Sequence, residues 1–233
     1  MWDNHQSLDL LANWLFALAA VMAIYLISYW AIHLPALPLQ EMNIRGSNGD
    51  GRLQHVTREQ IDSVVRSEEM GNFLTVDLEA TRKAFDKLPW VRAVSVRRIW
   101  PRGLEVTLEE HVALARWGSD ALVSTQGEIF NAASDERLPV FEGPPESSGD
   151  MVRQYDVFNK LLQPLELSIG QMSLSPRRAW RVHLNSGLVL ELGREQVEAR
   201  LARFVLLHDR SVAQLNQRLS YVDLRYPGGF AAR

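Results

Sequence analysis

The residues with the clearest chemical potential in this chain are Glu109-Glu110-His111, two carboxyl groups followed by an imidazole. Carboxylates and histidine are the usual general acids and bases, so this triplet is the first place to look for proton transfer. Neighbouring residues on a strand point to opposite faces, however, and the triplet ends a segment with strand periodicity. A solvated strand end is therefore the simpler interpretation.

Other catalytic and metal-binding patterns are missing from the sequence. It has no cysteine, which excludes disulfides, thiolate nucleophiles and cysteine zinc sites. It has neither a Gly-x-Ser-x-Gly elbow nor a His-Glu-x-x-His motif. None of the histidines has metal-ligand spacing: His5, His33, His55, His111, His183 and His208. The sequence thus predicts no enzyme, no cofactor and no metal, and it favours an interaction protein.

Composition limits the partners further. The net charge is −3, so no basic field invites nucleic acid. Gly228-Gly229 lacks the strand–turn–helix context of a phosphate loop and is interpreted as a turn, and no small-molecule substrate site is visible. The length allows two small domains of about 70 and 120 residues after an N-terminal segment.

The N-terminal segment has the composition of a membrane span. Residues 10–40 contain no Asp, Glu, Lys or Arg, and Trp14–Ile32 is almost purely apolar. About 20 such residues in a helix cover the ~30 Å hydrocarbon core of a bilayer. The pattern predicts a transmembrane helix over residues 13–34, preceded by a tail of residues 1–12. A buried core helix is seldom apolar on every face.

A cleaved signal peptide is the other alternative, but the first ten residues hold no Lys or Arg and the apolar run exceeds about 15 residues. Charge gives an indication of orientation. The tail carries Asp3 and Asp9, whereas Arg45, Arg52 and Arg58 follow the span. Read literally, the positive-inside rule places the large part in the cytoplasm, although the rule is weak for long domains.

Residues 39–110 predict a small α+β domain with the order strand, helix, helix, strand, strand. Thr57 and Gln60 form a capping box at the first helix, and Asp77 caps the second. Leu104, Val106 and Leu108 then alternate with polar residues in the last strand. We expect a three-stranded sheet with both helices on one face.

Residues 111–233 predict a β-rich domain with a mixed or antiparallel sheet and flanking helices. Turn residues indicate hairpins within 121–130 and 180–193, and apolar spacing indicates helices within 152–162 and 197–205. Gly143–Asp150 is interpreted as a mobile loop. The last strand is expected at Tyr221–Tyr226, with Tyr226 on the face of its apolar residues.

Several stretches carry a family resemblance, above all Leu88–Pro101 and Leu104–Glu110. Others follow in the same order: Phe73–Leu78, Ala115–Trp117, Leu122–Val123, Gly127–Phe130, Arg177–Trp180, Leu192–Arg194, Arg200–Val205 and Tyr221–Tyr226. Together they cover nearly the whole chain. This ordered set resembles the bacterial FtsQ/DivIB cell-division family, in which the first module is a POTRA domain.

The resemblance implies an essential divisome scaffold. Such a protein is a single-pass type II protein of the inner membrane at the septum, with a cytoplasmic N-terminus and a periplasmic C-terminal domain. It joins FtsB and FtsL, links early cytoplasmic to late periplasmic division proteins, and controls septal peptidoglycan synthesis. This implication overrides the indication from charge.

The resemblance also implies partner-binding residues. FtsB adds a strand at the final strand of the β domain, which we expect at a sheet edge. The matching positions are Arg177, Arg225, Tyr226, Gly228 and Gly229, and a second, POTRA surface matches Val96 and Arg98. Without the resemblance, Tyr226 reads as a core residue and Arg177 as a solvated charge.

Two alternative functions lack sequence support. A POTRA-containing transport or outer-membrane assembly factor needs a following β-barrel, for which this chain is too short. A membrane-anchored periplasmic hydrolase needs a catalytic constellation that the sequence does not contain.

Overall fold

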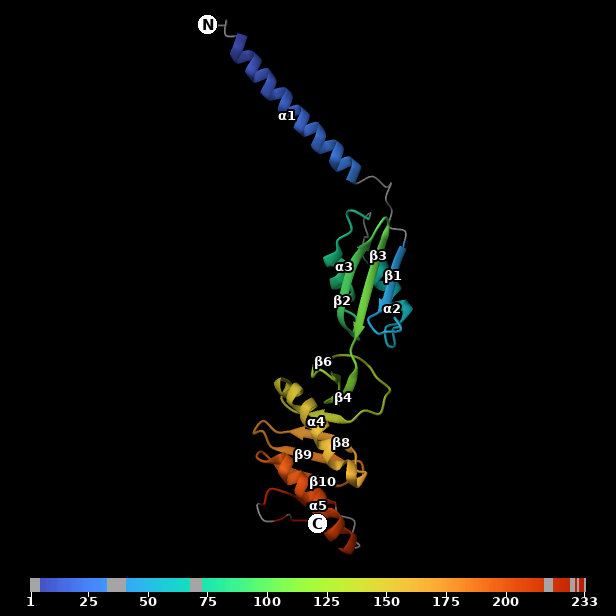
Figure 1. The fold of residues 1–233 in the computed structure, drawn as a ribbon, viewed down its shortest axis with the longest axis vertical. Helices are drawn as coiled ribbons and strands as arrows, with labels where there is room; N and C mark the ends of the chain where they lie inside the picture. Colours follow the sequence, from blue (N-terminus) through green and yellow to red (C-terminus); the bar gives the residue numbers. More distant parts are fainter. Residues whose placement is uncertain are drawn as a thin grey trace. The chain divides into compact units, whose positions relative to one another are not determined.

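The computed structural model describes residues 5–32, 41–67, 73–215, 220–226, 229 and 231–232. It divides into two compact units, Met1–Glu110 and His111–Arg233, and each is described by itself (Figure 1). The fold class is α+β, with one N-terminal apolar helix, as the sequence predicted.

The N-terminal helix α1 spans His5–Ile32. Its segment Asp9–Trp30 is long and apolar enough to cross a membrane, and none of it is buried within the structure. A core helix is mostly buried, so this exposure speaks against the core-helix alternative. The large apolar residues of Asp9–Trp30 are instead exposed.

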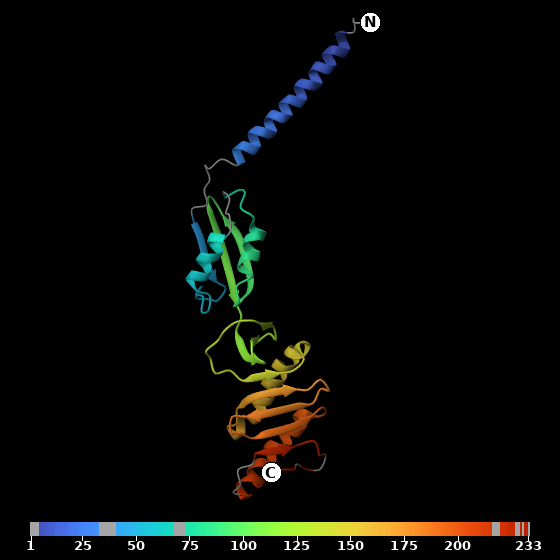
Figure 2. The ribbon, with the colours of Figure 1, turned by 180° about the vertical axis from the view of Figure 1, so that it is seen from behind.

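The first unit continues with β1 (Glu41–Gly46), α2 (Arg58–Ser67), α3 (Leu78–Phe85), β2 (Val91–Ile99) and β3 (Gly103–Glu110). Its described strands form a three-stranded sheet in the order β1-β3-β2, with β1 parallel and β2 antiparallel to β3. Both helices cover one face, as predicted (Figures 1 and 2). The alternating Leu104, Val106 and Leu108 of β3 are completely buried.

Both helices of the first unit begin at the predicted caps. The Thr57 N–H donates to Gln60 Oε1 at 3.0 Å, and the Gln60 N–H donates to Thr57 Oγ1 at 3.3 Å. Asp77 Oδ1 accepts the N–H groups of Glu79 and Ala80 at 2.9 and 3.0 Å. These bonds satisfy donors that a helix N-terminus otherwise leaves unpaired.

The second unit is built on one large sheet. Its strands are β4 (Ala113–Trp117), β5 (Ala121–Ser124), β6 (Ile129–Phe130), β7 (Val140–Glu142), β8 (Ile169–Leu174), β9 (Trp180–Leu184), β10 (Val189–Gly193), β11 (Tyr221–Asp223) and β12 (Ala231–Ala232). Among the described residues they follow the order β12-β11-β10-β9-β8-β7-β4-β5-β6. The pairs β4/β7, β7/β8 and β10/β11 are parallel and the others antiparallel, so the sheet is mixed.

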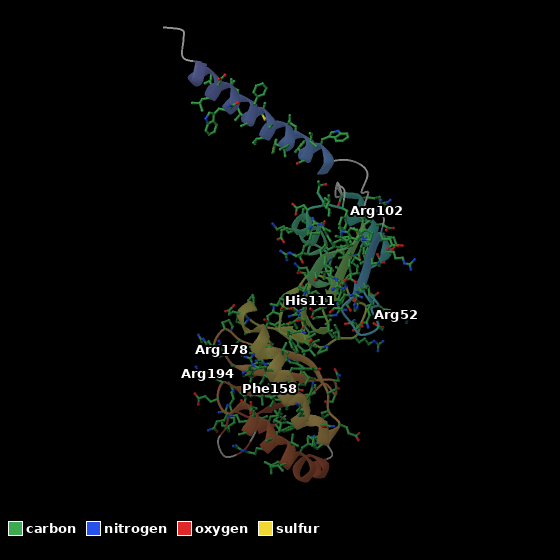
Figure 3. All side chains as sticks on the ribbon, turned by 45° about the horizontal axis from the view of Figure 1, so that its top comes forward. Arg52, Arg102, His111, Phe158, Arg178 and Arg194 are labelled. Atoms are coloured by element: carbon green, nitrogen blue, oxygen red, sulfur yellow. The ribbon has the colours of Figure 1, made fainter. Side chains whose placement is uncertain are left out.

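Helices α4 (Ser148–Leu162) and α5 (Val197–Leu215) lie on one face of this sheet (Figures 1 and 2). The core fills the space between the helices and the sheet. Phe141 of β7, Phe158 of α4 (Figure 3) and Phe204 of α5 are completely buried there. The Phe158 ring meets the Trp180 ring edge to face, with 6.0 Å between their centroids.

The prediction of a mobile loop at Gly143–Asp150 is wrong. This segment forms a 3-10 helix, η1 (Pro145–Ser147), and α4 begins at Ser148. The Ser147 hydroxyl donates to the Pro144 carbonyl and the Ser148 hydroxyl to the Gly127 carbonyl, both at 2.6 Å. Serine hydroxyls thus order a stretch that its Pro, Gly and Ser content made look like a loop.

The prediction for the final strand is also wrong, both in the length of the strand and in its position at the edge of the sheet. β11 ends at Asp223, because the Asp223 carboxylate accepts the Arg225 N–H at 3.0 Å in a side-chain turn. β12 then pairs antiparallel with β11, so Val222 faces Ala232 and Asp223 faces Ala231. The edge of the sheet at this end is therefore β12 and not β11.

The buried Phe158 provides a test of the second core. We expect Phe158→Ala to lower the free energy of unfolding by about 3–5 kcal/mol, because it leaves a cavity and removes the contact with Trp180. Thermal unfolding of the full chain in detergent, followed by circular dichroism, measures the change. The exposed Leu206 of α5 is the control: Leu206→Ala should stay within about 0.5 kcal/mol. Equal stability of the two variants contradicts this description of the core.

Candidate partner-binding site

Glu109, Glu110 and His111, the acid–base candidates of the sequence, each contact a different part of the protein. The Glu110 carboxylate accepts the backbone N–H groups of Gln54, His55 and Val56 at 2.7, 2.8 and 2.7 Å. Glu109 accepts from Arg92 Nη1 at 2.6 Å, and His111 is buried and stacks on Phe130 in the second unit. The three side chains therefore contact different parts of the protein and do not form an acid–base cluster. Glu109, which is partly exposed, fits best the solvated strand end that the sequence suggested.

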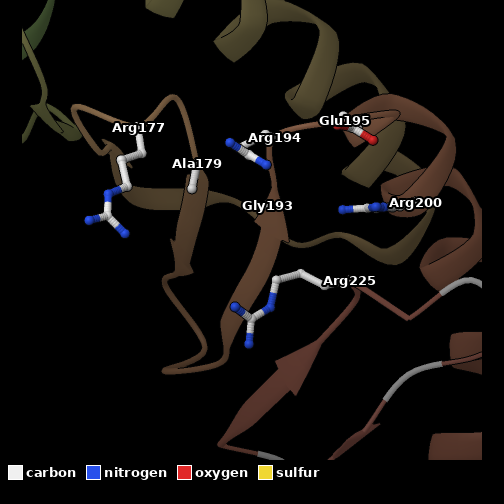
Figure 4. Close-up of a pocket in the computed structure, with 7 residues that line it drawn as sticks. All are labelled: Arg177, Ala179, Gly193, Arg194, Glu195, Arg200 and Arg225. Atoms are coloured by element: carbon white, nitrogen blue, oxygen red, sulfur yellow. The ribbon is translucent and has the colours of Figure 1, made fainter.

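Four arginines line one pocket of the second unit (Figure 4). They come from four different places in the chain: the β8–β9 turn, the end of β10, helix α5 and the residues after β11. The lining residues are Arg177, Ala179, Gly193, Arg194, Glu195, Arg200 and Arg225. With a single carboxylate among four guanidinium groups, this basic pocket is suited to an acidic partner.

Gly193 sets the close approach of two of these arginines. Its φ is +76°, and a Cβ atom at this position would lie 2.8 Å from Arg200 Nη1 and 3.1 Å from Arg225 Cγ. Only glycine fits this backbone conformation and this spacing without strain. Arg200 is held by a bond from its Nη1 to the Leu192 carbonyl at 2.6 Å.

Arg225, which lines the pocket, forms a bidentate ion pair with Asp223. Arg225 Nε donates to Asp223 Oδ1 at 2.9 Å, and Arg225 Nη2 donates to Oδ2 at 2.6 Å. These bonds hold the pKa of the buried Asp223 carboxyl below its usual range and raise the pKa of Arg225. The two bonds fix the orientation of the Arg225 guanidinium at the pocket.

Arg177 and Arg194 are exposed and, unlike Arg225, neither has a hydrogen bond or ion pair within the described part of the chain. Their ten N–H donors are therefore available to a ligand. The family resemblance implied Arg177 as a site residue, whereas Arg194 was not predicted. The sequence did contain an indication of Arg194, because it directly follows Gly193, the glycine that ends β10.

Tyr226 lies just beyond the pocket and is not a core residue. Val222 and Leu224 are buried, but Tyr226 is 56% exposed, so the alternation that placed it with them does not continue beyond Leu224. Its carbonyl accepts a long bond, 3.5 Å, from Arg203 Nη1. Gly229 is half-buried and precedes the exposed β12, whereas Gly228 lies outside the described residues.

The two residues predicted on the first unit have contacts within their own domain. Val96 is half-buried and pairs across the sheet with the buried Val106. Arg98 Nε donates to the Phe73 carbonyl at 3.0 Å, and its Nη2 donates to the Val76 carbonyl at 2.7 Å. Arg98 thus holds the segment before α3, and binding of a partner at this surface stays a prediction.

Comparison with known proteins places these observations in a family. The C-terminal domain of cell division protein FtsQ/DivIB matches residues 115–225, and the FtsQ-type POTRA domain matches residues 38–111. The cell division protein FtsQ of Nitrosospira multiformis is 64% identical over 233 residues, 100% of this chain and 99% of that protein. The chain belongs to the FtsQ/DivIB family.

More distant FtsQ proteins also match along the whole chain. The cell division protein FtsQ of Burkholderia pseudomallei is 40% identical and that of Neisseria gonorrhoeae 34% identical, over 94% and 95% of those proteins. The family assignment supports a role in cell division through interactions among division proteins, and FtsQ is not known as an enzyme. It does not support the transport-factor alternative, since the POTRA domain is of the FtsQ type.

The Asp223–Arg225 pair predicts a pH-dependent stability. Because the folded pKa of Asp223 is lowered, the pair stabilises the fold above the unfolded pKa of about 3.9, and this contribution is lost as the pH falls through the folded pKa. We expect Arg225→Met to destabilise the protein by about 1–2 kcal/mol at pH 7, with the exposure of Arg225 favouring the low end.

Thermal unfolding of wild type and Arg225→Met between pH 3 and pH 7 measures this effect. The difference between the two melting temperatures should shrink as the pH falls below about 4. Arg194→Met is the control, because Arg194 lines the same pocket but has no partner among the described residues. The difference between its melting temperature and that of wild type should not depend on pH. A constant difference for Arg225→Met contradicts the assigned ion pair.

Proposed function

We propose that this protein is a membrane-anchored divisome scaffold that binds FtsB, and FtsL with it, through the end of the large sheet formed by β12, Tyr226 and the basic pocket. In this role it links early cytoplasmic to late periplasmic division proteins and controls septal peptidoglycan synthesis. The observation that carries the proposal is that the exposed edge strand β12, the exposed Tyr226 and a pocket lined by four arginines belong to the same domain.

Edge-strand pairing explains how an extended partner segment attaches. A strand at the end of a sheet presents backbone N–H and C=O groups on its outer side, and a partner strand can bond to them. β12 occupies this position, and both Ala231 and Ala232 are exposed. Their small side chains leave the backbone accessible, so a strand of FtsB has room to align along β12.

Exposed side chains of the same domain give the proposed contact its specificity. Tyr226 offers a broad ring and a hydroxyl, the side-chain type that often carries a large share of binding energy at interfaces. Arg177 and Arg194 present planar guanidinium groups that pair bidentately with carboxylates. We therefore expect the bound segment of FtsB to contain acidic residues that reach this pocket.

The anchor follows from α1. We propose that α1 spans the inner membrane as a type II anchor, with residues 1–12 in the cytoplasm and both folded units in the periplasm at the septum. The support is the length and exposed apolar surface of Asp9–Trp30 together with the family assignment.

Truncation of Tyr226 tests the FtsB site. We expect Tyr226→Ala in the full chain, held in detergent micelles, to weaken binding of the periplasmic part of FtsB by about 30-fold or more, since a central interface tyrosine is worth about 2 kcal/mol. Isothermal titration calorimetry measures the affinity, and circular dichroism checks the fold.

Ile129→Ala is the matched control, because Ile129 is an exposed apolar residue on β6, at the opposite edge of the same sheet. It should leave FtsB binding unchanged. Arg177→Glu should weaken binding and make it less sensitive to salt. Full affinity in both Tyr226→Ala and Arg177→Glu places the FtsB site elsewhere.

A single cysteine tests the proposed topology, since the chain has no native cysteine. Gly49 lies on an exposed turn with open space around its Cα, so Gly49→Cys can carry a label without strain. A membrane-impermeant maleimide should label Gly49→Cys in intact spheroplasts, whereas Asp3→Cys in the tail should react only after lysis. The opposite pattern means that the folded units are cytoplasmic.

A further inference from the structure

The tip of the β2–β3 hairpin exposes apolar side chains that the first unit leaves out of its core. Trp100 is 83% exposed, and Ile99 beside it is 38% exposed. Leu74 is 48% exposed and lies at the same tip, because Arg98 Nη2 bonds to its carbonyl at 3.5 Å and Arg98 pairs with Leu104 near the end of the hairpin. Three large apolar residues thus gather around one turn.

Trp100 is an exception among the tryptophans of the folded units. Trp90 and Trp180 are buried in the two cores, and Trp117 is half-buried against the second core. A tryptophan with most of its surface in water is costly unless another surface covers it. The described residues of the first unit do not cover its exposed indole.

The topology of the sheet fixes where this tip lies along the chain. β1 runs parallel to β3, and Glu41 at the start of β1 pairs with Gly103, directly after the tip. Only residues 33–40 separate Glu41 from Ile32 at the end of α1. The nine Cα–Cα steps from Ile32 to Glu41 span at most about 30 Å. Gly103 lies one strand spacing, about 5 Å, from Glu41, so the tip stays within about 35 Å of the end of α1.

The chemistry of the tip matches a lipid headgroup layer. Tryptophan is enriched at membrane–water interfaces, where its apolar ring and polar N–H are both accommodated. Arg102 lies at this end of the first unit (Figure 3) and has no hydrogen bond or ion pair within the described residues. A guanidinium beside an exposed indole suits contact with lipid phosphates.

We propose that the hairpin tip, Trp100 with Ile99 and Leu74, inserts into the headgroup layer of the bilayer that α1 spans, and that Arg102 contacts lipid phosphates there. The proposal rests on the membrane anchorage by α1 proposed above. Its consequence is a second attachment point, which holds the first unit against the membrane in one orientation instead of leaving it free on its tether.

Single-cysteine labels in the full chain test this contact. Leu74→Cys reports on the tip, Gly49→Cys on the opposite end of the same sheet, about 20 Å away, and Ala19→Cys on the middle of α1. Each variant carries an NBD fluorophore in nanodiscs of phosphatidylcholine and phosphatidylglycerol. Nitroxide lipids with the quencher near the headgroup or deep in the acyl region then measure the depth of each label.

We expect the shallow quencher to reduce the Leu74→Cys signal at least about twofold and to leave the Gly49→Cys signal nearly unchanged. Adding Trp100→Ala to Leu74→Cys should lower the quenching to the Gly49→Cys level, and Trp100→Phe, which keeps a ring, should retain most of it. Ile129→Ala, which removes an exposed apolar residue of the second unit, should have no effect. Circular dichroism checks that each variant is folded.

The outcomes separate this contact from the anchor. Deep quenching at Ala19→Cys with no quenching at Leu74→Cys overturns the hairpin contact and leaves the anchor intact. Quenching at Leu74→Cys that persists in Trp100→Ala means that the tether alone holds the tip near lipid, which also overturns the proposal. An unquenched Ala19→Cys means that α1 does not span the bilayer, and both proposals then fail together.

Discussion

The Asp223–Arg225 interaction determines how the large sheet ends. The Asp223 carboxylate accepts both the Arg225 N–H and its guanidinium, so the backbone turns after three residues of β11 instead of continuing as a strand. The chain then returns as β12, and Tyr226 is left outside the core. One local interaction thus creates the sheet edge, positions Arg225 at the pocket and exposes the tyrosine.

The arginine pocket gives this edge its charge. Arg200 and Arg225 are neutralised or fixed by groups of the protein itself, whereas Arg177 and Arg194 are exposed without a partner among the described residues. Like charges this close together repel, and bound carboxylates relieve the repulsion. In the proposed complex, the pocket attracts an acidic partner before any backbone pairing forms, and strand addition at β12 then fixes the register.

Local rules predicted much of the fold. The capping box at Thr57, the cap at Asp77 and the two hairpins of the second unit all depend on residues close in sequence. β12 could not be predicted, because Ala231–Ala232 is too short for any periodicity and depends on pairing with β11. The strands β7 and β8 were not predicted either, since each pairs in parallel with a strand distant in sequence.

The site shows the same division between local and tertiary information. Arg177, Arg225 and Tyr226 entered through a family resemblance, but the pocket itself is formed by four elements that meet only in the folded sheet. Gly193 looked like a hairpin end, and its role in bringing Arg200 and Arg225 together is visible only in three dimensions. Tyr226 and Trp100 are exposed because the chain turns next to them. The alternation of apolar and polar side chains does not show where such a turn occurs.

The most direct test of strand addition is backbone amide hydrogen exchange at Ala231 and Ala232, measured by NMR with and without the periplasmic part of FtsB. If FtsB pairs with β12, exchange at this edge should slow strongly on binding, while Ile129 and Phe130 of β6, at the other edge, should not change. Binding that leaves the β12 amides unprotected, or that protects β6 instead, contradicts the account.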